Sequence, residues 1–251
     1  MQPISKTKLK ELASFRQQKI CEEQGVFVAE GAKLAAEVLS MGVPIDTLCA
    51  TEEWFLEYGE NNPTVRNQWK VDANQLERIS TLRQPNKVWM LMERSVAKAQ
   101  ALKSACQPSS LTLVLERIQD PGNLGTIIRT ADWFGIRNIV CSYDSVSCFN
   151  SKVVQSTMGS LFRVDVSYCD LSKWLSNCGL PVYGAVIDGI DLRQAEIAVP
   201  AALVIGNESR GISPEIRARV TNQIAIPNLG GSCESLNAAV ATAILVSQFT
   251  L

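Results

Sequence analysis

QIAIPNLGGSCESLNAAVATAILVSQFTL, residues 223–251, combines three structural signals in one stretch. Its apolar beginning predicts a strand, the pair Gly230–Gly231 predicts a turn, and the alanine-rich end predicts a helix that starts near Ser235. A glycine loop lets backbone groups approach a ligand, and the unpaired N–H groups of a helix start lie beside it. Ser235 and Asn237 are therefore candidate ligand-binding groups, unless Ser235 only caps the helix.

The composition is that of a globular chain of 251 residues, 46% of them hydrophobic, which suffices for one large or two modest domains. No apolar window reaches 18 residues and the N-terminus lacks a signal-peptide pattern, so we expect a cytoplasmic protein without membrane spans. The lack of histidine excludes Ser-His-Asp and Cys-His catalysis and most metal sites. Eight cysteines without a C-x-x-C pair predict reduced thiols, and the net charge of −1 does not favour broad polyanion binding.

The first 95 residues or so alternate between strand and helix patterns, which predicts a compact α/β unit. The polar stretch 95–110 predicts the end of this unit, so we expect domains at 1–100 and 108–251. The opening segment to residue 19 has a helical and basic pattern that would either contact phosphates or face solvent. Eight apolar residues are expected in the core: Val26, Val28, Leu34, Val38, Ile45, Leu48, Val88 and Leu91.

The second unit begins with the buried-strand pattern LTLVLERI and continues into DPGNLGTIIRTADWFGI, residues 120–136. We expect a tight turn over Asp120–Gly125 and a helix over Thr126–Phe134. Asn123 and Arg129 would then face a cleft at the carboxyl end of the strand, where open α/β sheets hold ligands. The alternative is that Asn123 serves the turn and Arg129 forms a surface ion pair. The glycines do not follow G-x-G-x-x-G, so a nucleotide-binding Rossmann site is disfavoured.

A third motif, GNESRGISPEI, follows the predicted strand AALVI at residues 206–216. Its glycines predict a turn, and Ser213-Pro214 predicts a helix start. Glu208 is either a carboxylate of the site or an acid favoured by the dipole at a helix start.

In this order, the stretches DPGNLGTIIRTADWFG, LVIGNESRGIS and IPNLGGSCESLNAAVA resemble the three motifs of the SpoU-type (TrmH-like) RNA ribose 2′-O-methyltransferases of the SPOUT superfamily. The resemblance covers about residues 111–251, and GVFVAEGAKLAAEVL near the N-terminus resembles the small substrate-binding domain that often precedes them. It implies an α/β fold with a mostly parallel, trefoil-knotted C-terminal domain, an exception to un-knotted topology. It also implies a homodimer whose sites draw on both chains.

The resemblance further implies S-adenosyl-L-methionine as cofactor and no metal. The implied catalytic residues are Arg129, Asn123, Glu208, Ser235 and Asn237. The implied cofactor-binding residues are Gly206, Ile226, Leu229, Ser235 and Leu236. This sequence departs from the family in a third motif that is one residue longer, with Asn228 where methionine is common. We expect Arg129 to orient the ribose hydroxyl and bind phosphate, because deprotonating arginine at pH 7 costs roughly 7 kcal/mol or more.

The expected function is therefore methyl transfer to a ribose 2′-hydroxyl of structured RNA, with ribosomal RNA favoured over transfer RNA by the additional N-terminal domain. An RNA-binding or ribosome-assembly protein that has lost turnover is the alternative from a different class. A nucleotide-dependent enzyme on a Rossmann-like sheet is the third.

Overall fold

A computed structural model describes residues 4–105 and 110–251. The chain divides into two compact units, one of Met1–Gln100 with Phe149–Gly159 and the other of Ala101–Cys148 with Ser160–Leu251. The expected domain limits, 1–100 and 108–251, stay predictions, and residues 106–109 at that boundary lie outside the described residues. Each unit contains one β-sheet.

The first unit contains a four-stranded sheet in the order β1-β4-β2-β3, in which only β2 and β3 run parallel. Its strands are β1 (Val26–Glu30), β2 (Ile45–Ala50), β3 (Val65–Lys70) and β4 (Val88–Glu93). Its helices are α1 (Lys6–Ser14), α2 (Gln18–Glu23), α3 (Ala32–Ser40), α4 (Glu52–Tyr58), α5 (Ala73–Ile79) and α8 (Ser151–Thr157), and α6 (Arg94–Ala105) runs into the second unit. The alternation of strands and helices is confirmed, but the polar stretch after residue 94 is largely helix.

The core of the first unit agrees with the predicted one: all of the eight predicted residues are buried except Val26, which is half-buried. Local capping explains where α5 begins. The Asp72 carboxylate accepts the Gln75 N–H, and the Gln75 side chain returns to the Asp72 N–H. This capping box satisfies two N–H groups that a helix start otherwise leaves unpaired.

The second unit contains a six-stranded sheet in the order β10-β8-β9-β5-β6-β7, and all of its pairings are parallel. Its strands are β5 (Leu111–Leu115), β6 (Asn138–Ser142), β7 (Asp165–Cys169), β8 (Val182–Asp191), β9 (Ala201–Ile205) and β10 (Asn222–Ala225). β9 is buried throughout and β5 is buried except at Thr112, as their largely apolar sequences predict for central parallel strands. The predicted mostly parallel α/β domain is confirmed, while the trefoil knot stays a prediction.

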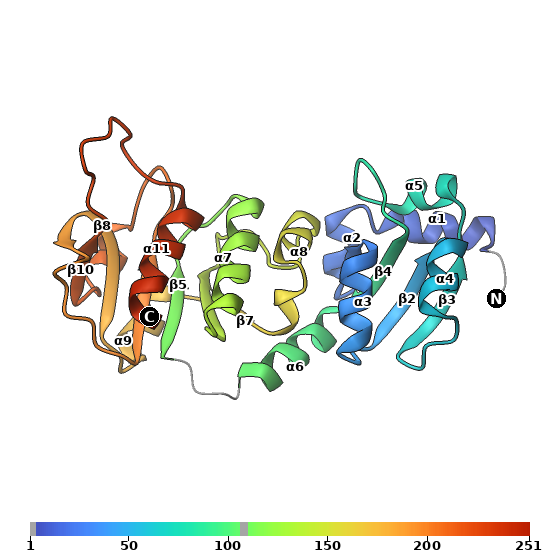
Figure 1. Cartoon of the computed structure of the whole chain (residues 1–251), viewed down its shortest axis with the longest axis horizontal. Helices are drawn as coiled ribbons and strands as arrows, with labels where there is room; N and C mark the ends of the chain where they lie inside the picture. The colour runs from blue at the N-terminus through green and yellow to red at the C-terminus, as the bar shows by residue number, and fades with distance from the viewer. Residues whose placement is uncertain (1–3, 106–109) are drawn as a thin grey trace. The chain divides into compact units, whose positions relative to one another are not determined.

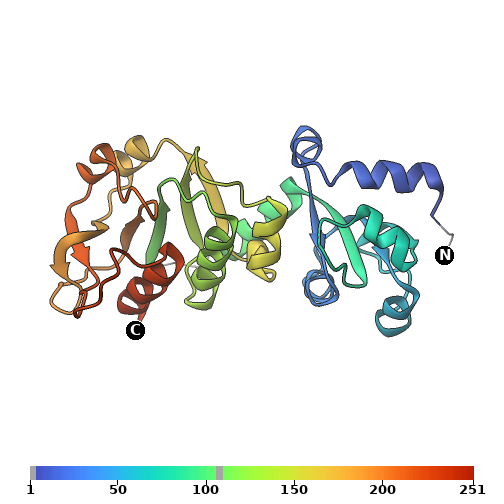
Figure 2. The same ribbon diagram turned by 90° about the horizontal axis from the view of Figure 1, so that it is seen from above.

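Helices cover both faces of this sheet. α7 (Pro121–Trp133) and α11 (Ala238–Thr250) pack side by side on one face (Figures 1 and 2). α9 (Leu171–Asn177) and α10 (Pro214–Arg217) pack on the other, and the short 3₁₀ helix η1 (Ser160–Phe162) lies beside α7. β6 and β7 lie on one side of β5 and β9, β8 and β10 on the other, so the strand order changes side between β5 and β9. The carboxyl ends of these two strands therefore form the switch point where α/β sheets bind ligands.

Two predicted boundaries in this unit are wrong. The expected turn over Asp120–Gly125 is the first part of α7, because the Asp120 carboxylate caps the Asn123 N–H and proline at the first helical position favours the helix. The last helix starts at Ala238 and its N-cap is Asn237, so Ser235 does not cap it. The predicted helix start at Ser213-Pro214 is confirmed.

Candidate active site

An open cleft of about 1000 Å³ lies at the carboxyl end of the parallel sheet. Its walls come mainly from three segments, which are residues 185–188 of β8, the loop after β9 and the loop after β10. All five predicted cofactor residues line it: Gly206, Ile226, Leu229, Ser235 and Leu236. Leu229 and Leu236 are 83% and 46% exposed, so apolar surface is available to a ligand there. Their roles stay predictions.

The loop after β9 turns so tightly that its first residue must be glycine. A Cβ atom on Gly206 would lie 2.3 Å from the backbone carbon of Gly211. Asn207 and Gly211 exchange backbone hydrogen bonds of 3.2 and 2.8 Å across the turn. The loop therefore forms a closed unit that holds Glu208 at its tip.

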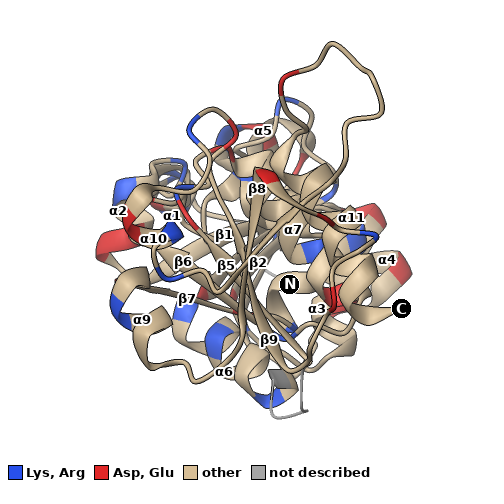
Figure 3. Cartoon of the chain, turned by 90° about the vertical axis from the view of Figure 1, so that its left-hand side faces the viewer, with Lys and Arg blue, Asp and Glu red and all other residues tan. Residues whose placement is uncertain are grey.

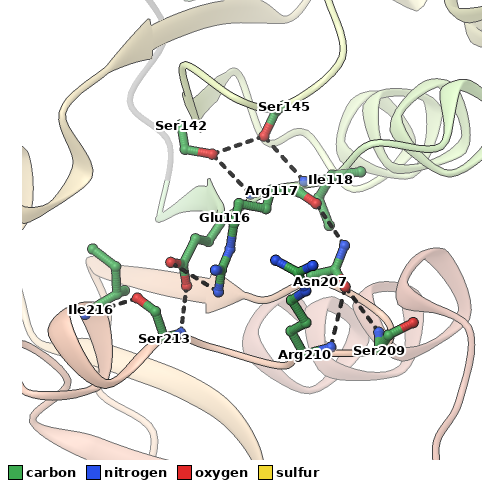
Figure 4. A network of polar contacts seen from close by, with 10 residues as sticks. All are labelled: Glu116, Arg117, Ile118, Ser142, Ser145, Asn207, Ser209, Arg210, Ser213 and Ile216. Carbon is green, nitrogen blue, oxygen red and sulfur yellow. Dashed lines mark hydrogen bonds and ion pairs between the residues drawn. The ribbon is translucent and has the colours of Figure 1, made fainter.

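A polar network fastens this loop to the end of β5 (Figure 4). Asn207 Nδ2 donates to the Arg117 carbonyl at 3.0 Å, while its Oδ1 accepts the N–H groups of Ser209 and Arg210. The buried Glu116 carboxylate accepts the Ser213 N–H at 2.8 Å. The loop after β9 is thus hydrogen-bonded to the end of β5 both before and after its turn.

The anchor of this network is a strained residue. Arg117 has a left-handed backbone with φ of 56°, a conformation that costs a residue with a side chain about 1 kcal/mol. Its N–H donates to Ser142 Oγ at 2.8 Å and its carbonyl accepts the Asn207 amide, so both backbone groups are satisfied. Its guanidinium lies 3.4 Å from the Glu116 carboxylate. Glu116 and Arg117 were not predicted from the sequence, although two charged residues directly after a buried strand are a detectable signal.

Three predicted catalytic residues, one from each motif, meet beside the cleft. Asn123 Nδ2 donates to Glu208 Oε1 at 2.5 Å, and Asn237 Nδ2 donates to Asn123 Oδ1 at 2.8 Å. Asn237 Oδ1 also accepts the Ala239 and Val240 N–H groups at the start of α11. The amides of Asn123 and Asn237 therefore have defined orientations and hold the Glu208 carboxylate in place.

The structure decides between the alternative roles that the sequence left open for Asn123, Glu208 and Arg129. The Asn123 side chain does not serve a turn, since it bonds to two residues far away in the sequence. Glu208 does not belong to a helix start, because the following helix begins at Pro214. Arg129 is exposed and has no ion pair or hydrogen bond among the described residues, so it joins neither a surface ion pair nor the cluster. Ser235 is exposed and likewise makes no hydrogen bond within the described part of the chain.

An ion pair also lines the cleft. Arg217 Nη2 donates to Asp188 Oδ2 at 2.7 Å, and this guanidinium lowers the pKa of the Asp188 carboxyl. Asp188 was not predicted from the sequence, where its only signal is a charged residue after the apolar strand pattern PVYGAVI.

The described residues contain neither a cluster of metal-ligating side chains nor a membrane-spanning helix. Within residues 4–105 and 110–251, no group of three or more His, Cys, Asp or Glu residues has the geometry of a metal site. In the same ranges, no helix combines the length and the apolar character needed to cross a membrane.

Each of the two parts of this chain matches a known protein family. Residues 110–247 match the SpoU rRNA Methylase family, and residues 6–89 match the MRM3-like substrate binding domain. The 23S rRNA (guanosine(2553)-2′-O)-methyltransferase RlmP of Bacillus subtilis is 36% identical over 138 residues, which are 53% of this chain and 55% of that protein. The chain thus matches about half the length of this relative.

Two solved structures are similar over nearly the whole chain. A TrmH-family protein from Porphyromonas gingivalis has a TM-score of 0.83 at 36% identity, covering 99% of this chain and 98% of that one. The AdoMet-bound rRNA methyltransferase from Sinorhizobium meliloti has a TM-score of 0.81 at 27% identity, covering 99% and 96%. The family match spans more than half of the chain and all three motifs, so the predicted relationship is confirmed and the protein belongs to the SpoU rRNA Methylase family.

Proposed function

We propose that this protein transfers a methyl group from S-adenosylmethionine to a ribose 2′-hydroxyl of ribosomal RNA. The observation that carries the proposal is the hydrogen-bonded cluster of Asn123, Glu208 and Asn237, which joins the three family motifs beside one cleft. The similarity to a 23S rRNA 2′-O-methyltransferase and to an AdoMet-bound rRNA methyltransferase supports the substrate and the cofactor. The match to a substrate binding domain supports an RNA-binding role for the first unit.

The cleft suits the proposed cofactor. Its volume of about 1000 Å³ accommodates a nucleoside with an amino-acid tail, and the exposed Leu229 and Leu236 offer apolar contacts to an adenine ring. Gly206 lines the cleft, so the backbone at the end of β9 is available to a ligand there. When bound, the sulfonium group supplies a reactive methyl donor. The protein's remaining task is then to place the ribose hydroxyl in line with that methyl group.

Positioning is what the Glu208 cluster can provide. Glu208 is fixed by Asn123, and Asn123 is fixed in turn by Asn237, whose own orientation is set by the helix start. We propose that this rigid carboxylate and its amide partners orient the cofactor and the RNA, while an arginine binds the phosphate next to the target ribose.

We further propose that this arginine comes from a second copy of the chain. Arg129 lies on the exposed stripe of α7, one turn before Trp133, which is 85% exposed. On the neighbouring α11, Val240 and Ile244 are 49% and 39% exposed, and Leu251, its C-cap, is 98% exposed. An apolar surface of this kind across two adjacent helices favours a homodimer. Arg129 would then enter the partner's site.

Transfer of labelled methyl from S-adenosylmethionine to total RNA tests the proposed reaction. The RNA should come from a strain that lacks this gene, and the ribose-methylated position should be mapped. We expect one new 2′-O-methyl site in ribosomal RNA, and none with an Asn123→Ala variant as control. A new site in transfer RNA would correct the substrate. No incorporation despite cofactor binding would favour a non-catalytic assembly protein.

Mixing two inactive variants tests the shared site. Arg129→Ala and Asn123→Ala should each inactivate the proposed homodimer. If Arg129 acts across the interface, half of the randomly paired dimers are mixed and each contains one complete site, so about one quarter of the wild-type activity should return. If both residues act within one chain, no activity returns.

A further inference from the structure

The loop between β10 and α11, residues 226–237, forms much of the cleft wall but has few interactions of its own. It projects from the end of the sheet, and Glu234 is the single charged residue in its sequence (Figures 1 and 3). In the described structure, residues 227–236 make no backbone–backbone hydrogen bond. Fixing the backbone of a free loop costs about 1–2 kcal/mol for each residue. Side-chain contacts must therefore offset this cost if the loop is ordered before a ligand binds.

One side chain closes this loop on itself. Asn228 Oδ1 accepts the N–H groups of Gly230 and Gly231 at 3.0 and 2.8 Å. Asn228 Nδ2 donates to the carbonyls of Gly231 and Cys233 at 3.0 and 3.4 Å. These four contacts fold the segment from 228 to 233 around one amide, and the turn requires φ of +104° at Gly230, a conformation that favours glycine.

We infer that Asn228 is a positioning residue that preorganises the cofactor loop before the cofactor binds. Asn228 matters for binding only if the loop holds the cofactor, so the role assigned here rests on the proposed function. The amide holds the short turn between Leu229 and Ser235, two residues that line the cleft. Without it, the free protein must order the loop when the ligand arrives, and that ordering cost lowers the affinity.

Replacing Asn228 should lower cofactor affinity and leave the turnover number at saturating cofactor unchanged. Asn228→Ala removes all four contacts and should raise the dissociation constant for S-adenosylhomocysteine about tenfold, which corresponds to about 1.4 kcal/mol. Asn228→Asp keeps both acceptor contacts to the glycine N–H groups and loses the two donated ones, so its dissociation constant should lie between wild type and Asn228→Ala. The turnover number at saturating cofactor should stay within about twofold of wild type, since among the described residues the Asn228 side chain hydrogen-bonds only within its own loop.

Asn222→Ala provides a matched control. Asn222 is also an exposed asparagine, at the first position of β10, and among the described residues its side-chain amide bonds only to the neighbouring Thr221. It does not line the cleft, so its replacement should leave the dissociation constant unchanged.

Calorimetric titration of the full chain with S-adenosylhomocysteine, combined with amide hydrogen exchange of the ligand-free protein, tests this role. We expect weaker binding and faster exchange at Gly230 and Gly231 in Asn228→Ala. Weaker binding with unchanged exchange would mean that Asn228 contacts the ligand directly, and would overturn preorganisation. Unchanged affinity would overturn the role altogether. If the wild-type chain itself does not bind, the proposed function fails first, and the two failures are thereby distinguished.

Discussion

Replacing Asn123 by aspartate should break the central cluster while keeping its shape. In the wild type, Asn123 Nδ2 donates to Glu208 Oε1 at 2.5 Å, and Asn123 Oδ1 accepts from Asn237. Asn123→Asp keeps the acceptor for Asn237 but places a second carboxylate against Glu208. The change is isosteric, so a loss can be assigned to charge and hydrogen bonding.

The magnitude follows from the two interactions that change. A hydrogen bond to a charged group contributes about 1.5–3 kcal/mol, and this bond disappears. Two carboxylates about 3 Å apart repel by roughly 5 kcal/mol at an effective dielectric constant of 20, which solvent at this half-buried position reduces strongly. We therefore expect Asn123→Asp to lower the free energy of unfolding by about 2–4 kcal/mol at pH 7 and to abolish methyl transfer.

The pH dependence gives the sharper test. Repulsion by Glu208 raises the folded-state pKa of the introduced carboxyl above its unfolded value of about 3.9. Below that value the group is protonated in both states, and an O–H donor can restore a bond to Glu208. The variant should therefore approach wild-type stability near pH 4 and lose stability as the pH rises through the raised pKa.

Urea denaturation of both proteins from pH 4 to 8 measures this difference. Asn222→Asp, an exposed change of the same type, serves as control and should stay within about 0.5 kcal/mol of wild type. A stability difference for Asn123→Asp that is below 1 kcal/mol at pH 7, or that does not shrink toward acid pH, would refute the assigned hydrogen bond.

Four further outcomes are expected. Arg129→Ala should abolish methyl transfer and leave cofactor affinity in calorimetry nearly unchanged, whereas normal turnover would remove Arg129 from its role. Gly206→Ala should cost about 1–3 kcal/mol in urea denaturation, because its Cβ would lie 2.3 Å from backbone; a neutral result would contradict the tight turn. Trp133→Glu should turn the proposed homodimer into a monomer in sedimentation analysis, while Leu56→Glu, at a residue that is 82% exposed in the first unit, should not. Tyr168→Phe should cost about 1–2 kcal/mol in urea denaturation, since its hydroxyl bonds to the Val146 carbonyl and the Cys148 N–H; wild-type stability would show that these contacts contribute little.

Local pattern alone determined the elements of this fold. Continuous apolar runs identified the buried strands β5 and β9, and alternating strand and helix signals identified an α/β architecture. Each of these signals depends on a few consecutive residues, so the sequence suffices to predict the strands and helices. The boundary errors arose where capping competes with turn signals. Asp120 followed by proline begins a helix as readily as a turn. The contact that decides between them is the hydrogen bond from the Asn123 N–H to the Asp120 carboxylate, which is visible only in the structure.

Only the tertiary structure decided which polar residues act together. Asn123 lies 85 residues from Glu208 and 114 from Asn237, and their contacts depend on strand order, which no local pattern encodes. The motifs identified all three as candidates together with Arg129, yet Arg129 lies on the solvent side of α7 and outside the cluster. A helix displays its residues around a full circle, and the packing of α7 against the sheet and α11 decides which of them can reach a shared site.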